Sequence, residues 1–158
     1  MPSLKRILFV CMGNICRSPA GENVFRHLAA ARGLEQDYFV DSAGTIGYHV
    51  GEPPDSRMSA AGEKRGIVFT GHSRQFRIED FQEFDLIVTM DESNRQGVLQ
   101  LALGPEAEAK VRPFCSFVTR HPDQEVPDPY YGGEDGFEHV MDLMEDGCEG
   151  ILREFPAH

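Results

Sequence analysis

Cys11 and Arg17 are the two residues of this chain whose types and spacing best fit a chemical role. A cysteine thiolate is a strong nucleophile, and a guanidinium presents a planar fork that holds two phosphate oxygens and stabilises charge that develops in a transition state. The other cysteines have no arginine at the same offset; Glu22, His121 and Glu154 stand there instead. The pair therefore predicts nucleophilic attack on a phosphate group.

The elements on either side of these residues would place them at a phosphate-binding loop. Residues 5–10 predict a buried strand, and Ser18 before Pro19 predicts an N-cap and the first position of a helix. A tight turn between a strand and a helix points backbone N–H groups at an oxyanion, and the helix dipole adds to their attraction. Gly13 gives the loop backbone freedom, and Asn14 tolerates a left-handed conformation. The predicted phosphate-binding residues are Met12, Gly13, Asn14, Ile15, Cys16, Arg17 and Ser18.

The rest of the chain alternates predicted strands and helices. Further strands are expected at residues 39–43, 85–90 and 110–114, and helices from Pro19 to near Gly33 and at residues 56–65, 94–101 and 137–155. This order favours an α/β fold in a single domain at residues 1–158, with an open, four-stranded, mostly parallel sheet, helices on both faces and the phosphate loop after the first strand. Gly21, inside the first helix, is expected to cost that helix only a little stability.

The composition excludes several kinds of partner and cofactor. With 158 residues and a formal net charge of −11, the chain lacks the surplus of Lys and Arg that nucleic acid or an anionic membrane requires. The apolar run at residues 7–10 is too short for a signal peptide or a membrane span, and four cysteines without a C-x-x-C pair indicate reduced thiols. The histidines and cysteines show no metal-ligand spacing. We therefore expect a cytoplasmic monomer that needs no metal and no cofactor.

The loop resembles the signature of the low molecular weight protein tyrosine phosphatases, in which a cysteine, five residues and Arg-Ser lie between a strand and a helix. The similarity extends over nearly the whole chain. Its further segments are residues 41–45 (DSAGT), 54–57 (PDSR), 84–87 (FDLI), 90–94 (MDESN) and 126–133 (VPDPYYGG). The resemblance implies hydrolysis of phosphotyrosine in protein substrates and of small aryl phosphates, with release of inorganic phosphate.

The resemblance also implies roles for residues far from the loop. Asp128 corresponds to a general acid that protonates the leaving phenolate and then, as a base, activates the water that hydrolyses a phosphocysteine on Cys11. The residues that match a supporting hydrogen-bond network are Asn14, Ser18, Ser42 and His72. The aromatic residues that match the walls of the substrate cleft are Tyr48, Tyr130 and Tyr131.

Other interpretations of the same loop stay open. Arsenate reductases and protein arginine phosphatases share this fold, and a non-catalytic module could bind phosphoproteins. The reductases need a further cysteine pair on a mobile segment, which residues 80–94 lack, and the arginine phosphatases carry Thr where this loop has Ile15. All three predicted catalytic residues are present, which favours catalysis. Cys16 lies five positions from Cys11 and could trap its oxidised form as a disulfide, which makes it a candidate redox partner.

Overall fold

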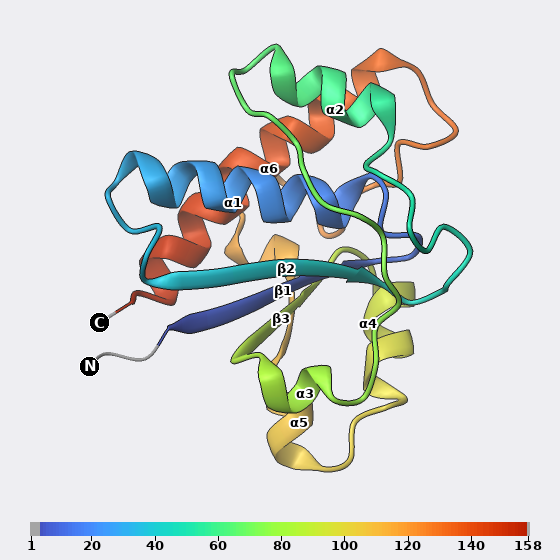
Figure 1. Ribbon diagram of the computed structural model, residues 1–158, viewed down its shortest axis with the longest axis vertical. Coiled ribbons are helices and arrows are strands. Elements are labelled where there is room, and N and C mark those ends of the chain that lie inside the picture. Colours follow the sequence, from blue (N-terminus) through green and yellow to red (C-terminus); the bar gives the residue numbers. More distant parts are fainter. Residues whose placement is uncertain (1–3, 158) are drawn as a thin grey trace.

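The computed structural model describes residues 4–157 and contains a sheet with the strand order β2, β1, β3, β4 (Figure 1). The strands are β1 (Lys5–Cys11), β2 (Tyr38–Gly44), β3 (Leu86–Thr89) and β4 (Val111–Pro113). Every neighbouring pair is parallel. The predicted α/β class with an open four-stranded sheet is confirmed. The carboxyl ends of all strands therefore point to the same end of the sheet, where ligand sites of such folds form.

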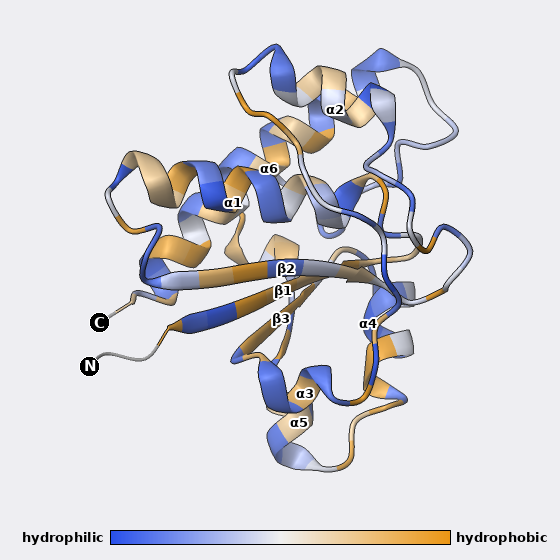
Figure 2. Ribbon diagram, in the orientation of Figure 1, coloured by the Kyte–Doolittle hydropathy of each residue, from blue (hydrophilic) through white to orange (hydrophobic). Residues whose placement is uncertain are grey.

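Helices cover both faces of the sheet. One face carries α1 (Arg17–Ala31), α2 (Ser56–Glu63), α6 (Glu134–Glu154) and the short 3-10 helix η1 (Phe114–Phe117), and the other carries α3 (Asp80–Glu83), α4 (Glu92–Leu99) and α5 (Pro105–Ala109) (Figure 1). Side chains of β1 alternate between these layers: Ile7 and Phe9 pack in the core under α1 and α6, and Leu8 and Val10 pack on the opposite side. A strand buried on both faces has the continuous apolar run seen in β1 (Figure 2).

Some helix boundaries differ from those predicted. α1 begins at Arg17 rather than at Pro19, and α6 begins at Glu134, before its first buried apolar residue Phe137. α3 and α5 have no counterpart among the predicted elements. They have four and five residues, and helices of one turn are too short to show a periodic apolar stripe.

Gly21 on α1 also has a packing role, which the expected small cost in helix stability does not describe. A β-carbon at this position would lie 2.7 Å from the ring of Phe9. That ring is fully buried and packs against the rings of Phe25 and Phe114, so it has no free space into which to move. The absent side chain brings α1 close to β1, and these two elements flank the predicted phosphate loop.

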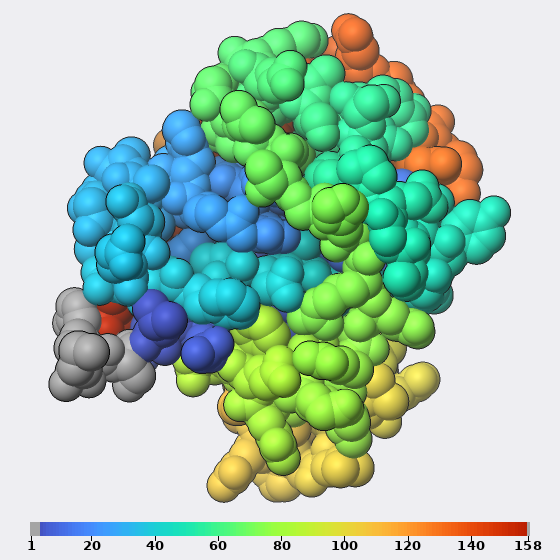
Figure 3. Space-filling model, viewed as in Figure 1, coloured from blue at the N-terminus to red at the C-terminus, as the bar shows by residue number. Residues whose placement is uncertain are grey.

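The connection from α2 to α3 crosses the outside of the edge strand β2 near its carboxyl end (Figures 1 and 3). The backbone N–H of Gly44 donates to the carbonyl of Arg74 at 2.9 Å, which fixes this crossing. The hydroxyl of Ser73 then reaches the carbonyl of Gly13 at 3.1 Å. The connection therefore supports the loop after β1 from the side of β2.

Candidate active site

Residues 12–16 join β1 to α1 in a compact loop. The end of β2 and the residue that follows it contact this loop on one side. The N–H of Thr45 donates to the carbonyl of Cys11 at 2.9 Å. Gly44 permits this close approach, because a β-carbon on it would lie 2.6 Å from the carbonyl oxygen of Met12. The end of β2 thus determines the path of the loop after β1.

The loop leaves several backbone N–H groups available to a ligand. Asn14 has a φ of 58°, the left-handed conformation expected of it, and its N–H donates to the sulfur of Cys11 at 3.3 Å. Among residues 4–157, the N–H groups of Gly13, Ile15 and Cys16 have no hydrogen-bond partner. With the free N–H groups in the first turn of α1, they form a nest of donors suited to an oxyanion.

The sulfur of Cys11 is surrounded by polar groups although the residue is only 2% exposed. Its Sγ lies 3.0 Å from the hydroxyl of Ser18, which accepts from the side-chain amide of Asn14 at 2.7 Å and lies 3.3 Å from the carbonyl of Ala43. The prediction of Ser18 as the N-cap of α1 is wrong. Cys16 occupies the N-cap position without a side-chain cap, and the Ser18 hydroxyl lies beside the sulfur of Cys11 instead.

Arg17 is buried, and acidic groups from two later segments hold its guanidinium. Its Nη1 lies 2.5 Å from Asp91 Oδ2 and donates to the carbonyl of Val126 at 3.1 Å. Its Nη2 lies 3.7 Å from Asp128 Oδ2. Burial lowers the pKa of Arg17, but the neighbouring thiol and the two carboxylates raise it above its ordinary value overall. The guanidinium is therefore a permanent cation beside Cys11.

Asp91 is a site residue to which the sequence analysis assigns no role. It follows β3, and its carboxylate accepts from the N–H of Asn94 at 2.8 Å in a capping box at the start of α4. Because β1 and β3 are parallel neighbours, their carboxyl ends lie together, and this brings Asp91 to Arg17. The signals of this role in the sequence are an acidic residue directly after a predicted strand and its place in the MDESN segment at residues 90–94.

A chain of buried polar groups runs from the loop to the surface. The side-chain amide of Asn14 donates to Ser42 Oγ at 2.9 Å, and that hydroxyl donates to Glu22 Oε1 at 2.6 Å. Burial raises the pKa of Glu22, which also pairs with Arg26. His72 is exposed beside a small cavity next to these groups, and within the described residues its ring has no hydrogen-bond partner. Glu22, which the sequence analysis does not identify, continues the network that His72 was expected to join.

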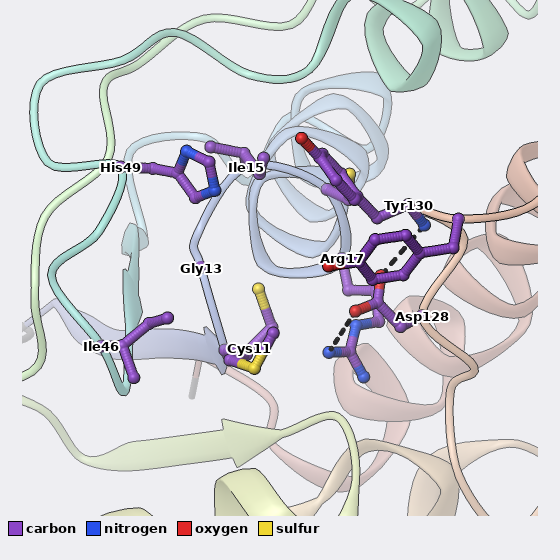
Figure 4. Close-up of a pocket in the computed structure, with 11 residues that line it drawn as sticks. Cys11, Gly13, Ile15, Arg17, Ile46, His49, Asp128 and Tyr130 are labelled. Carbon is purple, nitrogen blue, oxygen red and sulfur yellow. Dashed lines mark hydrogen bonds and ion pairs between the residues drawn. The ribbon is translucent and has the colours of Figure 1, made fainter.

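A pocket of about 60 Å³ opens in front of the loop (Figure 4). Tyr130 lies on one side of it, and His49 and Ile46 lie on the other. Tyr131 also lines the pocket, with its ring centroid 5.0 Å from that of Tyr130. Tyr48 is outside the lining: it is 82% exposed and packs edge-on against the ring of His49. The full lining is Cys11, Met12, Gly13, Ile15, Cys16, Arg17, Ile46, His49, Asp128, Tyr130 and Tyr131.

Asp128 lies in the wall of the same pocket, and its side chain is 33% exposed. Its Oδ1 accepts from the N–H of Tyr130 at 3.0 Å. The segment before it is held in place by the N–H of Val126, which donates to the carbonyl of Met90 at 2.8 Å. A carboxyl group that faces both solvent and the pocket can exchange a proton with either.

The described residues contain no metal-binding cluster and no membrane-spanning helix. Within residues 4–157, no group of three or more His, Cys, Asp or Glu side chains could hold a metal ion. None of the described helices is long and apolar enough to span a membrane. All four cysteines are free thiols. Burial, with a contribution from Asp55, raises the pKa of the Cys16 thiol far above its ordinary value, so this thiol stays protonated at neutral pH.

Comparisons with known proteins agree with this geometry. The family described as low molecular weight phosphotyrosine protein phosphatase matches residues 6–158. The low molecular weight protein-tyrosine-phosphatase YfkJ of Bacillus subtilis is 42% identical, over 92% of this chain and 92% of that protein. The crystal structure of a protein tyrosine phosphatase from Entamoeba histolytica has a TM-score of 0.92 and 42% identity, over 95% of this chain and 96% of that one. An arginine phosphatase from Drosophila has a TM-score of 0.88 and 34% identity, over 95% and 97%.

Proposed function

Because the chain belongs to the low molecular weight phosphotyrosine protein phosphatase family, and is a hydrolase of that kind, we propose that it hydrolyses phosphotyrosine in proteins, and small aryl phosphates, through a phosphocysteine on Cys11. The observation that carries this proposal is the position of Arg17. Its guanidinium lies in the phosphate loop between two carboxylates from distant segments, and one of them, Asp128, faces the same pocket as Cys11. A nucleophile, a cation and a proton donor thus share one pocket.

The first step is displacement at phosphorus. The Cys11 thiolate attacks the phosphorus atom, the bond from phosphorus to the phenolic oxygen breaks, and its electron pair stays on that oxygen, which takes the proton of Asp128. The free N–H groups of the loop and the guanidinium of Arg17 bind the three other phosphate oxygens, whose charge is redistributed in the transition state. Ser18 and Asn14 stabilise the thiolate with the hydrogen bonds described above.

The second step regenerates the enzyme. Asp128, now a carboxylate, removes a proton from a water molecule as the water oxygen attacks the phosphorus of the phosphocysteine. The sulfur–phosphorus bond breaks, its electrons return to Cys11 as thiolate, and inorganic phosphate leaves. Both steps use the same side chains, and Asp128 ends the cycle in the protonation state in which it began.

The pocket lining supports an aryl substrate over a guanidino one. Its side walls are largely apolar or aromatic, with Ile15, Ile46 and Tyr130 around the approach to the loop. A flat phenyl ring can pack against such walls while its phosphate reaches Cys11. The guanidinium part of phosphoarginine carries a charge and N–H donors, and it would lose hydration without gaining hydrogen bonds against the aliphatic side chains of Ile15 and Ile46. This argument favours the tyrosine phosphatase function over the arginine phosphatase function of the Drosophila relative.

The proposal is tested by assaying the purified protein, with a chelator present, on an aryl phosphate and on phosphotyrosine, phosphoserine and phosphoarginine peptides. We expect hydrolysis of the first two only, its abolition in Cys11→Ser, and a loss of about 100-fold or more in Asp128→Ala. A third substitution, Glu154→Gln, changes an exposed carboxylate that pairs with Arg112 outside the pocket and serves as the control. Hydrolysis of phosphoarginine alone, arsenate reduction, or phosphopeptide binding without turnover would each replace the proposed function by one of its alternatives.

A further inference from the structure

Arg57, in the first turn of α2, connects two segments of the active site that are far apart in the sequence. Its guanidinium donates to Asp55 through Nε and Nη2, each at 3.2 Å, and the same Nη2 donates to the carbonyl of Tyr130 at 3.0 Å. It also lies over the rings of Tyr130 and Phe137, at 5.2 and 4.8 Å from their centroids. The side chain is 47% exposed, yet every one of these contacts is directional.

On one side, this arginine is fixed to the phosphate loop. Asp55 is the N-cap of α2 and accepts from the backbone N–H of Arg57 at 2.8 Å. The backbone N–H of Asp55 donates to the carbonyl of Ile15, a loop residue, at 2.8 Å. Burial raises the pKa of Asp55, but the bonds from Arg57 lower it overall, so the carboxylate stays charged and keeps its hold on the guanidinium.

On the other side, Arg57 binds Tyr130, and Tyr130 in turn binds Asp128. Tyr130 accepts from Arg57 through its carbonyl and donates to Asp128 Oδ1 through its N–H. The two bonds lie on the two peptide groups that flank the Cα of Tyr130, so a single residue connects Arg57 to Asp128. Asp128 itself follows a proline and precedes one, but its side chain is exposed and has few other contacts.

We propose that Arg57 is a positioning residue for the general acid: by linking Asp55 at the phosphate loop to the Tyr130 carbonyl, it fixes Asp128 relative to the bound phosphate. This inference rests on the proposed function, because it requires Asp128 to protonate the leaving group. Arg57 touches no reacting atom. It acts by fixing the segment that carries Asp128 relative to the phosphate loop. A displacement of about 1 Å in a general acid is enough to reduce catalysis severely.

The role makes a prediction that a merely structural contact does not. A misplaced acid slows the departure of a basic phenolate, which needs the proton, and leaves the departure of an acidic phenolate nearly unchanged. We therefore expect Arg57→Ala to lower kcat/KM about tenfold for phenyl phosphate, and less than about twofold for 2,4-dinitrophenyl phosphate. Arg57→Lys should fall between, because one ammonium cannot replace a fork that serves Asp55 and Tyr130 together.

The matched control is Arg112→Ala. Arg112 is 42% exposed, lies 4.4 Å from the centroid of the Phe117 ring and pairs with Glu154, but contacts no residue of the pocket. We expect it to retain the parent kcat/KM for both substrates. Urea unfolding of all variants shows whether each is folded under the assay conditions. If Arg57→Ala is not folded, Arg57→Lys still tests the proposal.

A double-mutant cycle with Asp128→Ala separates the possible outcomes. If Arg57 acts through Asp128, Arg57→Ala has less than a twofold effect on phenyl phosphate hydrolysis once Asp128 is absent. Equal losses on both substrates, or a tenfold loss that persists in the Asp128→Ala background, would overturn the positioning role and assign Arg57 to substrate binding or to the fold. If Asp128→Ala alone shows no dependence on the leaving group, the general-acid role proposed for Asp128 fails, and the role of Arg57 fails with it.

Discussion

The ion pair of Asp91 with Arg17 can be separated into its charge and its capping role by two substitutions. Asp91 has two functions in the structure: it pairs with a guanidinium that is 3% exposed, and it caps α4 through the N–H of Asn94. Asp91→Asn removes the charge and keeps an oxygen for the cap, whereas Asp91→Ala removes both. The difference between the two variants therefore measures the cap, and the asparagine variant measures the charge.

The magnitudes follow from what Arg17 retains. Removing one partner of a buried ion pair costs about 3–5 kcal/mol. Arg17 keeps its bond to the carbonyl of Val126 and the more distant Asp128, so we expect the lower end, about 3 kcal/mol, for Asp91→Asn. Asp91→Ala adds about 1 kcal/mol for the lost cap. The two variants should thus lose about 3 and about 4 kcal/mol of unfolding free energy.

Urea unfolding at neutral pH is the assay. With a slope of about 2 kcal/mol per molar urea, the asparagine variant should unfold about 1.5 M earlier than the parent. Inorganic phosphate should reduce this gap, because an anion in the loop replaces the missing charge beside Arg17. The control, Glu154→Gln, removes a carboxylate from an exposed pair with Arg112 and should change stability by less than about 1 kcal/mol. If Asp91→Asn unfolds at the same urea concentration as Glu154→Gln, the loop alone orients Arg17 and the reasoning is refuted.

Three further predictions test other parts of the molecule. Burial raises the pKa of Asp146, but hydrogen bonds from an imidazole and from backbone N–H groups hold it at about 2, below its ordinary 3.8. Asp146→Asn should therefore cost about 2 kcal/mol at pH 7 and much less near pH 2, because most of the contribution is lost as the pH falls from 4 to 2. Equal losses in urea unfolding at both pH values would contradict this. Cys16→Ser should recover less activity than the parent when thiol is added after peroxide, because Cys11 then lacks its disulfide partner; full recovery would exclude that role. Gly21→Ala should lower the unfolding free energy by about 1–2 kcal/mol, because crowding against Phe9 outweighs the gain in helix propensity. A variant that is more stable than the parent in thermal unfolding would show that the Phe9 ring can move to accommodate the added methyl group.

The fold was accessible from the sequence because its main elements have strong periodic signals. The apolar run of β1 and the three- and four-residue steps of α6 predict a buried strand and an amphipathic helix, and both are present. The short helices α3 and α5 gave no such signal, because one turn is too short for a periodic pattern. Tertiary packing holds them instead: α5 contacts β4, and Phe81 of α3 lies in the same core cluster as Ile87 of β3. Gly21 illustrates a different limit: propensity describes an isolated helix, and only the position of Phe9 shows why glycine is needed.

The site divides in the same way. The loop from Cys11 to Ser18 is contiguous, so residue types and spacing were enough to predict a phosphate site there. The partners of that loop come from other strand ends, and no spacing rule relates Arg17 to Asp91 or Asn14 to Glu22. The resemblance to a family supplied Asp128 but gave no role to His49. The His49 ring lines the pocket, whereas the Tyr48 ring packs against His49 and does not reach the lining. Side chains that become neighbours only through the sheet order require the structure.

The central position of β1 has a consequence for how the chain is made. This strand is synthesised before both of its neighbours. Its edge toward β2 can pair once Gly44 has been made, but β3 begins only at Leu86, so the edge toward β3 stays unpaired until much later in translation. Pairings between distant segments form slowly, and an apolar strand with free edges is prone to wrong association in the meantime. The strand that ends at Cys11 is therefore also a segment of the nascent polypeptide that gains from early collapse onto α1.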